Sequence, residues 1–112
     1  MNPSDIYSMV LAILTKARAQ MLTPAYQAST ELADAGTRLK ASQTLIDVQQ
    51  AIVALSNASL SDIAQDLKGN EQGLTTATSD LTSALKSVTQ VLSIIDDATT
   101  LVKIVAKIVP FV

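Results

Sequence analysis

Apolar residues recur at every third or fourth position along most of the chain, which is the spacing of one face of an α-helix. No stretch alternates apolar and polar residues with β-branched enrichment, and no Asn-Gly or Asp-Gly pair indicates a β-hairpin. The pattern therefore predicts an all-α protein. At 112 residues, the chain is expected to form a single helical domain over residues 1–112.

The first helix is predicted over about residues 2–22, where the start signals are clear. Asn2 is a preferred capping residue, and Pro3 costs nothing at the first helical position because its missing N–H would have no partner there. Asp5 adds a negative charge in the first turn, which complements the positive end of the helix dipole. An apolar stripe then runs from Ile6 to Met21, so this helix is expected to bury one face.

Thr23 and Pro24 repeat the same start signal, so the chain either stops and restarts there or kinks within one long helix. A second helix is predicted over about residues 24–56, followed by a turn over 57–59, where Asn-Ala-Ser combines residue types that end and begin helices. The residues of this helix that we expect to face the core are Leu32, Ala35, Leu39, Leu45, Ile46, Val48, Ile52, Val53 and Leu55.

The second half of the chain has the most regular pattern, which we call the heptad seam. Alternating steps of three and four residues from Leu60 reach fifteen positions, of which fourteen are apolar: Leu60, Ile63, Leu67, Asn70, Leu74, Ala77, Leu81, Ala84, Val88, Val91, Ile95, Ala98, Val102, Val105 and Val109. A repeat of about 3.5 residues is typical of left-handed helix packing and predicts a long helix over about residues 60–109. The exception, Asn70, lies beside Gly69 and near Gly73, so a break at 69–73 is an open alternative.

Helix length then bears on topology. At ~1.5 Å per residue, nearly continuous halves would form arms of about 80 Å and 75 Å. Arms of matching length predict an antiparallel helical hairpin with a long heptad-patterned C-terminal helix. If the chain instead turns sharply at its weak points, the same pattern predicts a small up-down helix bundle. Those weak points are Pro24, Gly69 and Gly73, which we expect to act as hinges or kinks.

Composition excludes many chemistries. The chain has no Cys and no His, which removes disulfides, thiolate nucleophiles, imidazole bases and nearly every zinc site. A net charge of −2 and an aromatic content of 3% argue against nucleic acid, whose recognition uses basic surfaces and stacking side chains. We therefore expect no enzymatic activity, no catalytic or metal-ligating residue and no cofactor.

The apolar stretches are short. None approaches the ~18 residues that a transmembrane helix requires. The run from Met9 to Leu14 is preceded by Asp5 and by no Lys or Arg, unlike the basic start of a signal peptide. We expect a soluble chain with neither a signal peptide nor a transmembrane helix, and the cellular compartment is left open.

The C-terminal segment 94–112 is the strongest candidate for a contact surface. It carries apolar residues beyond the heptad seam that widen its apolar face: Ile94, Leu101, Ile104, Ile108 and Phe111. Lys103 and Lys107 occupy the remaining polar strip, as in helices that lie at a membrane surface. One partner arm cannot cover so wide a face. Three interpretations stay open: burial against the first helix, contact with a second copy or another protein, and contact with lipid.

The remaining polar motifs point to ordinary surface roles. Asp96 and Asp97 are neighbours on a helix and point about 100° apart, so we interpret them as a solvated face. The segment 69–73 lacks the strand and the Lys-Ser/Thr pair of a phosphate loop. The sequence favours a non-enzymatic structural or interaction protein that self-associates or docks a partner through apolar helix faces. The alternative is a membrane-active or lipid-contacting helical protein that uses its amphipathic segment 94–112.

Overall fold

The computed structural model describes residues 1–87 and 89–111, and this part of the chain contains helices and their connections but no strand. Six helices are found there: α1 (Pro3–Met21), α2 (Pro24–Glu31), α3 (Ala35–Asn57), α4 (Leu60–Gly69), α5 (Glu71–Ala84) and α6 (Val91–Ile108). The prediction of an all-α protein is confirmed. Val88, a predicted seam position, and Val112, the end of the predicted contact segment, lie outside the described residues.

The helix starts follow local chemistry. Asn2 Oδ1 accepts a hydrogen bond from the Asp5 N–H at 2.8 Å, and Thr23 Oγ1 accepts one from the Tyr26 N–H at 3.3 Å. Each bond satisfies a backbone donor that the first turn of a helix leaves unpaired. The predicted starts of α1 and α2 are confirmed, and the chain turns a corner between them.

The single helix expected over 24–56 is divided between Glu31 and Ala35. Asp34 begins α3 as its N-cap: its carboxylate accepts a hydrogen bond from the Thr37 N–H at 2.7 Å, and this bond lowers the pKa of the Asp34 carboxyl. Arg38 braces the connection by donating to the Ala33 carbonyl oxygen at 2.6 Å. The prediction missed this break because no proline or start signal as strong as Thr-Pro announces it.

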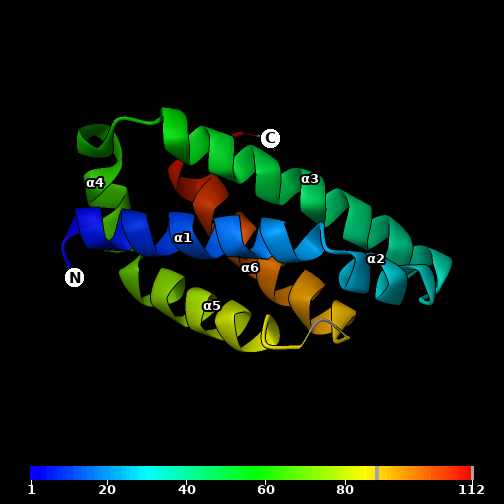
Figure 1. The fold of residues 1–112 in the computed structure, drawn as a ribbon. Helices are drawn as coiled ribbons and strands as arrows, with labels where there is room; N and C mark the ends of the chain where they lie inside the picture. Colours follow the sequence, from blue (N-terminus) through cyan, green and yellow to red (C-terminus); the bar gives the residue numbers. More distant parts are fainter. Residues whose placement is uncertain (88, 112) are drawn as a thin grey trace.

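The long helix expected over 60–109 is divided into three. Between α4 and α5 the hydrogen-bond ladder is barely interrupted, because the Asn70 N–H donates to the Asp66 carbonyl oxygen at 3.1 Å and the Leu74 N–H to that of Asn70 at 2.9 Å. The helices α5 and α6 run in opposite directions (Figure 1), although residues 85–90 of the sequence between them contain no Gly or Pro. The spacing from Ala84 to Val91 is one whole heptad (91 − 84 = 7). The apolar repeat therefore stays in register across the connection, and the sequence pattern gives no sign that the helix ends there.

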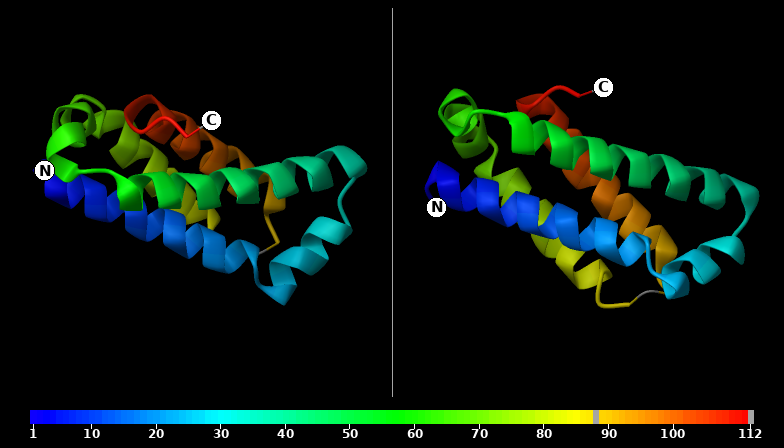
Figure 2. Two further views of the ribbon diagram at one scale, coloured as in Figure 1. Left: turned by 90° about the horizontal axis from the view of Figure 1, so that it is seen from above. Right: turned by 45° about the horizontal axis from the view of Figure 1, so that its top comes forward.

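Figures 1 and 2 show how the helices are arranged. The long helices α1 and α3 run in opposite directions and are joined by α2, while α4 lies across the end of the molecule where α3 stops and α5 begins (Figure 1). The most extensive contacts join α6 to α5 and to α3, and α1 packs on α3, α4 and α5. The Cα trace measures 43 × 25 × 19 Å, so the structure does not have the ~80 Å length expected for a two-rod hairpin.

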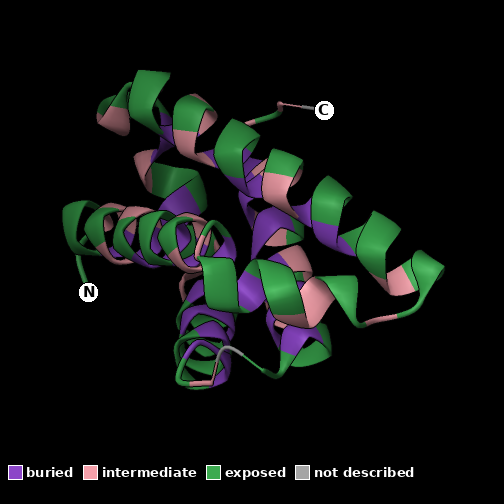
Figure 3. Ribbon diagram, turned by 45° about the vertical axis from the view of Figure 1, so that its right-hand side comes forward, coloured by how far each residue is buried: buried purple, intermediate pink, exposed green. Residues whose placement is uncertain are grey.

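The core is continuous through all six helices (Figure 3). The described seam positions face it: Leu60, Asn70 and Val109 are partly buried, and the others are buried. The 3.5-residue spacing therefore identified the inward face correctly, although three helices share it. The largest fully buried side chains are Ile6, Leu14, Met21, Leu55, Leu67, Leu74, Leu81, Ile94 and Leu101.

Candidate interaction surface

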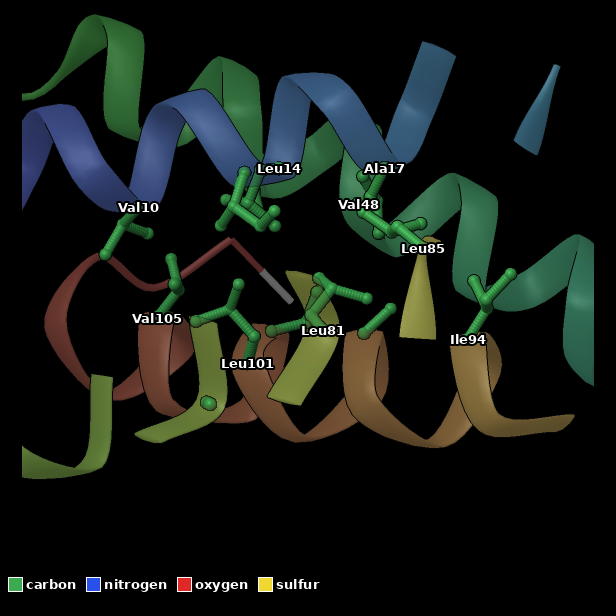
Figure 4. Close-up of a cluster of buried hydrophobic side chains, with 14 of the residues drawn as sticks. Val10, Leu14, Ala17, Val48, Leu81, Leu85, Ile94, Leu101 and Val105 are labelled. Atoms are coloured by element: carbon green, nitrogen blue, oxygen red, sulfur yellow. The ribbon is translucent and has the colours of Figure 1, made fainter. Parts of the chain in front are cut away.

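The residues predicted to form a C-terminal contact surface lie mostly in the core. Ile94 and Leu101 are completely buried and Ile108 is nearly so, whereas Ile104 and Phe111 are partly buried against the same cluster. Figure 4 shows Ile94, Leu101 and Val105 of α6 directed toward side chains of α1, α3 and α5. In this conformation the segment offers a partner little of its apolar face.

The reason is that α6 has two principal neighbours, whereas a hairpin would give it one. It packs against α5 and α3 along its length, which covers both the seam and the additional row of aliphatic side chains. Val10, Leu14 and Ala17 of α1 reach the same cluster from across the core (Figure 4). These residues are buried within the chain in this conformation, but their principal cover comes from α5 and α3 rather than from the first helix, which the sequence interpretation had named.

Hydrogen bonds and an ion pair stabilise the chain at two of the predicted hinges, Pro24 and Gly69. Pro24 is the first residue of α2, and the Gln27 side-chain amide bonds across that corner to the Met21 carbonyl oxygen at 2.7 Å. Gly69 ends α4, and the ion pair between Lys68 Nζ and Glu71 Oε1, at 2.7 Å, bridges the junction that follows it. The hydrogen bond from Lys68 lowers the pKa of Glu71.

Gly73 lies within α5 rather than at a break. A Cβ atom added there would meet Ile104 Cδ1 at 3.5 Å, an ordinary van der Waals distance. Neither the backbone conformation nor a close approach requires glycine at this position, because no glycine in the described residues has a positive φ. The sequence-predicted hinge at Gly73 is therefore a regular helical position in this structure.

The outer face of α3 carries an exposed apolar stripe. Leu39 is 74% exposed, Ile46 46% and Val53 58%, and the three are seven residues apart (46 − 39 = 7; 53 − 46 = 7). Residues that far apart lie close to one line along a helix. Figure 3 shows the exposed residues that follow this outer side of α3. We call these three residues the α3 stripe.

These residues were expected to face the core, and that expectation is wrong. The face that α3 buries contains Val48 and Leu55, as expected, but its other members are the small or polar side chains of Ala41, Thr44 and Ala51. Small residues allow helices to approach closely, and the buried Thr44 hydroxyl lies 3.4 Å from the Thr99 hydroxyl of α6. The seven-residue spacing of the stripe was visible in the sequence. The sequence did not show that the stripe faces solvent, because hydrophobicity alone favours burial of the larger aliphatic residues.

The surroundings of the α3 stripe are polar but carry few charges. Its flanks are lined by Ser42, Gln43, Gln49 and Gln50, all exposed. Asp47, the acid on this part of α3, accepts a hydrogen bond from the Gln43 side-chain amide at 2.9 Å. A flank with few charges leaves most of the binding free energy to complementarity of shape and apolar area.

A shallow groove of about 580 Å³ extends the α3 stripe toward the C-terminus. It is lined by Ile46, Gln49, Gln50, Val53, Ala54 and Phe111. Two stripe residues thus share a hollow with the partly buried ring of Phe111, and Figure 2 shows the C-terminal segment close to α3. Of the predicted contact residues, Phe111 is the one that lies beside the exposed apolar surface.

The acidic residues do not converge on a metal site. Asp97 lies in a hollow with Asp80 between α5 and α6, and burial, followed by the charges of Asp80 and Asp96, raises the pKa of its carboxyl. Within the described residues, no group of at least three His, Cys, Asp or Glu side chains could hold a metal ion. The pair Asp80–Asp97 is therefore a source of repulsion between two helices.

No helix in the described part of the chain combines the length and the apolar character needed to cross a lipid bilayer. Comparison with protein-family models, curated proteins and solved structures found no match.

Proposed function

We propose that this protein is a non-enzymatic interaction protein, a small helix bundle that self-associates when the α3 stripe of one copy packs against that of a second copy. The observation that carries the proposal is the line of three large aliphatic residues that α3 leaves in solvent. Apolar area removed from water contributes about 25 cal/mol per Å², and an aligned stripe concentrates that area where another helix can cover it.

The stripe is self-complementary under a two-fold axis. When two α3 helices lie antiparallel with the axis at Ile46, the equal spacing places Leu39 of one copy against Val53 of the other. The same arrangement brings Gln43 near Gln49 of the second copy, and the two amides can exchange hydrogen bonds. A closed dimer of this kind uses the same patch on both copies, as isologous interfaces do.

Charge favours the antiparallel orientation over the parallel one. The cationic side chains of α3, Arg38 and Lys40, both lie near its N-terminal end. An antiparallel pair keeps the cations of the two copies at opposite ends, and it also places the two helix dipoles head to tail. A parallel pair would bring like charges together.

The expected dimer is weak. The 23 residues of α3 form a helix about 34 Å long, and one helix-on-helix contact of this length buries less than the ~1,200–2,000 Å² of a stable interface. The groove beside Phe111 adds apolar area at the end of the stripe that contains Val53. We therefore expect an equilibrium between monomer and dimer that shifts with protein concentration.

Analytical ultracentrifugation over a range from about 1 μM to 1 mM tests the proposal. The wild-type protein should change from monomer to dimer, and Val53→Asp should remain monomeric because it would bury an unpaired charge. Leu92→Asp is the matched control: Leu92 is 57% exposed, as Val53 is at 58%, but it lies on α6 and is not a stripe residue. The control should dimerise like wild type.

Two outcomes would overturn the proposal: a wild-type monomer at every concentration, or equal loss of dimer in both variants. Co-sedimentation of the monomer with anionic liposomes would then favour the lipid-contacting alternative. That alternative requires the molecule to open, because Ile94 and Leu101 are buried in the closed form, and Leu101→Asp should abolish the lipid binding.

A further inference from the structure

The ring of Phe111 lies at the edge of the α3 stripe, although the two are far apart in the chain. Helix α6 ends at Ile108, and Val109 is extended (φ −131°, ψ 94°), so the segment that follows leaves the helical path. Pro110 cannot continue the helix because it has no backbone N–H. Phe111 is partly buried against the core, which anchors the ring and leaves part of it accessible.

The groove between this ring and α3 suits an apolar side chain. Ile46, Val53 and Ala54 line it from α3, together with the uncharged amides of Gln49 and Gln50. No charged side chain is among its lining residues. An aliphatic group that entered the groove would therefore leave water without burying a charge.

The size of the interface favours a second copy of the chain as the source of that group. The contact between two α3 helices alone buries less than the ~1,200–2,000 Å² of a stable interface. A side chain of the second copy that also contacted Phe111 would add apolar area without lengthening the contact between the helices.

Leu39 is the stripe residue in position to make this contact. In the antiparallel pair with its two-fold axis at Ile46, Leu39 of one copy lies against Val53 of the other, and Val53 lines the groove with Phe111. Leu39 is also more exposed than Ile46 or Val53. We propose that Phe111 and Val53 of each copy form a socket that receives Leu39 of the second copy. The socket rests on the self-association proposed above and adds to it a residue from outside α3.

The two sides of Val53 differ in how well they cover this leucine. Successive helical residues point about 100° apart, so Ala54 lies on one side of Val53 and Ser56 on the other. Ser56 is polar and exposed, whereas Ala54 shares the groove with Phe111. Leu39 of the second copy therefore buries more apolar surface when it packs on the side of Phe111.

Charge does not oppose this placement. The last turn of α3 contains no basic residue, and its free carbonyl groups give it a partial negative charge. The antiparallel register brings Arg38 of the second copy, the neighbour of Leu39, beside this end of the helix. A cation is favoured there.

Cross-linking between single-cysteine variants tests the socket, because the chain has no Cys of its own. Leu39→Cys chains are mixed with Phe111→Cys chains at a concentration where the wild type dimerises, and a short bismaleimide is added. We expect a cross-linked dimer in the mixture. Leu39→Cys alone should not cross-link, since the two copies of position 39 lie 14 residues apart in this register (53 − 39 = 14), about 21 Å along the helix axis. Leu92→Cys, at a similarly exposed position to Val53, replaces Leu39→Cys as the control for random collision.

Sedimentation measures what the socket contributes to affinity. Phe111→Ala should raise the Kd of the dimer about tenfold or more, because a symmetric dimer loses the contact twice, while Phe111→Leu should stay within about threefold, since it keeps an apolar wall. In a Leu39→Ala background, Phe111→Ala should change the Kd by less than about twofold, because the contact is already absent. A role of Phe111 in the monomer alone would not depend on Leu39.

The two proposals fail in different ways. A wild-type protein that remains monomeric would overturn self-association and the socket with it. A wild-type dimer that Val53→Asp abolishes would uphold self-association. The socket alone would then be wrong if Phe111→Ala left the Kd unchanged, or if the mixture cross-linked no more than the Leu92→Cys control.

Discussion

At the scale of the residue, the clearest distinction is between aliphatic side chains in the core and those on α3. Leu101 is completely buried, whereas Leu39 is 74% exposed, although the sequence pattern placed both on apolar stripes. Hydrophobicity marks a residue as one that gains from leaving water. Hydrophobicity does not indicate whether the side chain is buried by other parts of the same chain or by another molecule.

Alanine substitution separates these two environments. Leu101→Ala should lower the free energy of unfolding by about 2–5 kcal/mol, because it removes buried methyl groups and leaves a cavity. Leu39→Ala should change the stability of the monomer by less than about 0.5 kcal/mol. Urea denaturation of both variants at low protein concentration measures the difference, and equal losses would show that Leu39 is part of the core.

Tyr7 gives a residue-scale example of a contact that periodicity cannot reveal. Its hydroxyl donates to the Leu55 carbonyl oxygen at 2.9 Å and so ties α1 to the last turn of α3. The two residues are 48 positions apart in the chain, and a single sequence contains no signal for such a pairing. The buried hydroxyl of Tyr26, which has no hydrogen-bond partner among the described protein groups, was unpredictable for the same reason.

At the scale of the element, the sequence was reliable where capping chemistry was strong. Asn2-Pro3 and Thr23-Pro24 each predicted a helix start correctly, because a side-chain acceptor and a proline at the first position both act locally. The break before Asp34 and the reversal through residues 85–90 were missed. Their sequences are weak signals, and packing between distant helices decides that the chain turns there.

Substitution of Gly73 tests whether this position is an ordinary helical position of α5. Gly73→Ala should raise the free energy of unfolding by about 0.5–1 kcal/mol, since alanine restricts the unfolded chain and favours the helix. The new methyl group would lie at 3.5 Å from Ile104 Cδ1, which requires no rearrangement. Thermal unfolding measures the gain, and a clear loss of stability would indicate that glycine is needed for a different helix geometry.

The contact between α5 and α6 makes a prediction about pH. Burial and the charges of Asp80 and Asp96 raise the pKa of Asp97 above 3.8, so the folded protein holds the proton to higher pH than the unfolded chain does. Stability from this group is therefore present at low pH and is lost as pH rises from about 3.8 through the folded pKa. Asp97→Asn should raise Tm at pH 7 and leave it nearly unchanged at pH 3. A stabilisation of equal size at both pH values would contradict this linkage.

At the scale of the whole molecule, the sequence predicted the fold class and most of the inward-facing positions but not the topology. The heptad seam identified buried residues on α4, α5 and α6, and Leu74, Leu81 and Ile95 are all buried as expected. It could not show that the chain reverses, because a seven-residue spacing is the same within one helix and across a connection of matching length. The burial of Ile94 and Leu101 follows from that reversal, since a two-rod hairpin would have left part of α6 uncovered.

The connection between α5 and α6 has a consequence for how copies of this chain can exchange parts. Because the connection spans one complete heptad, a helical conformation there would produce a single helix over residues 71–108. This helix would be about 57 Å long and would have a continuous apolar face. Two chains that exchanged their α6 helices in this way would form two cores with the same contacts, each made of helices from both chains. The register of the repeat places no barrier against such domain swapping.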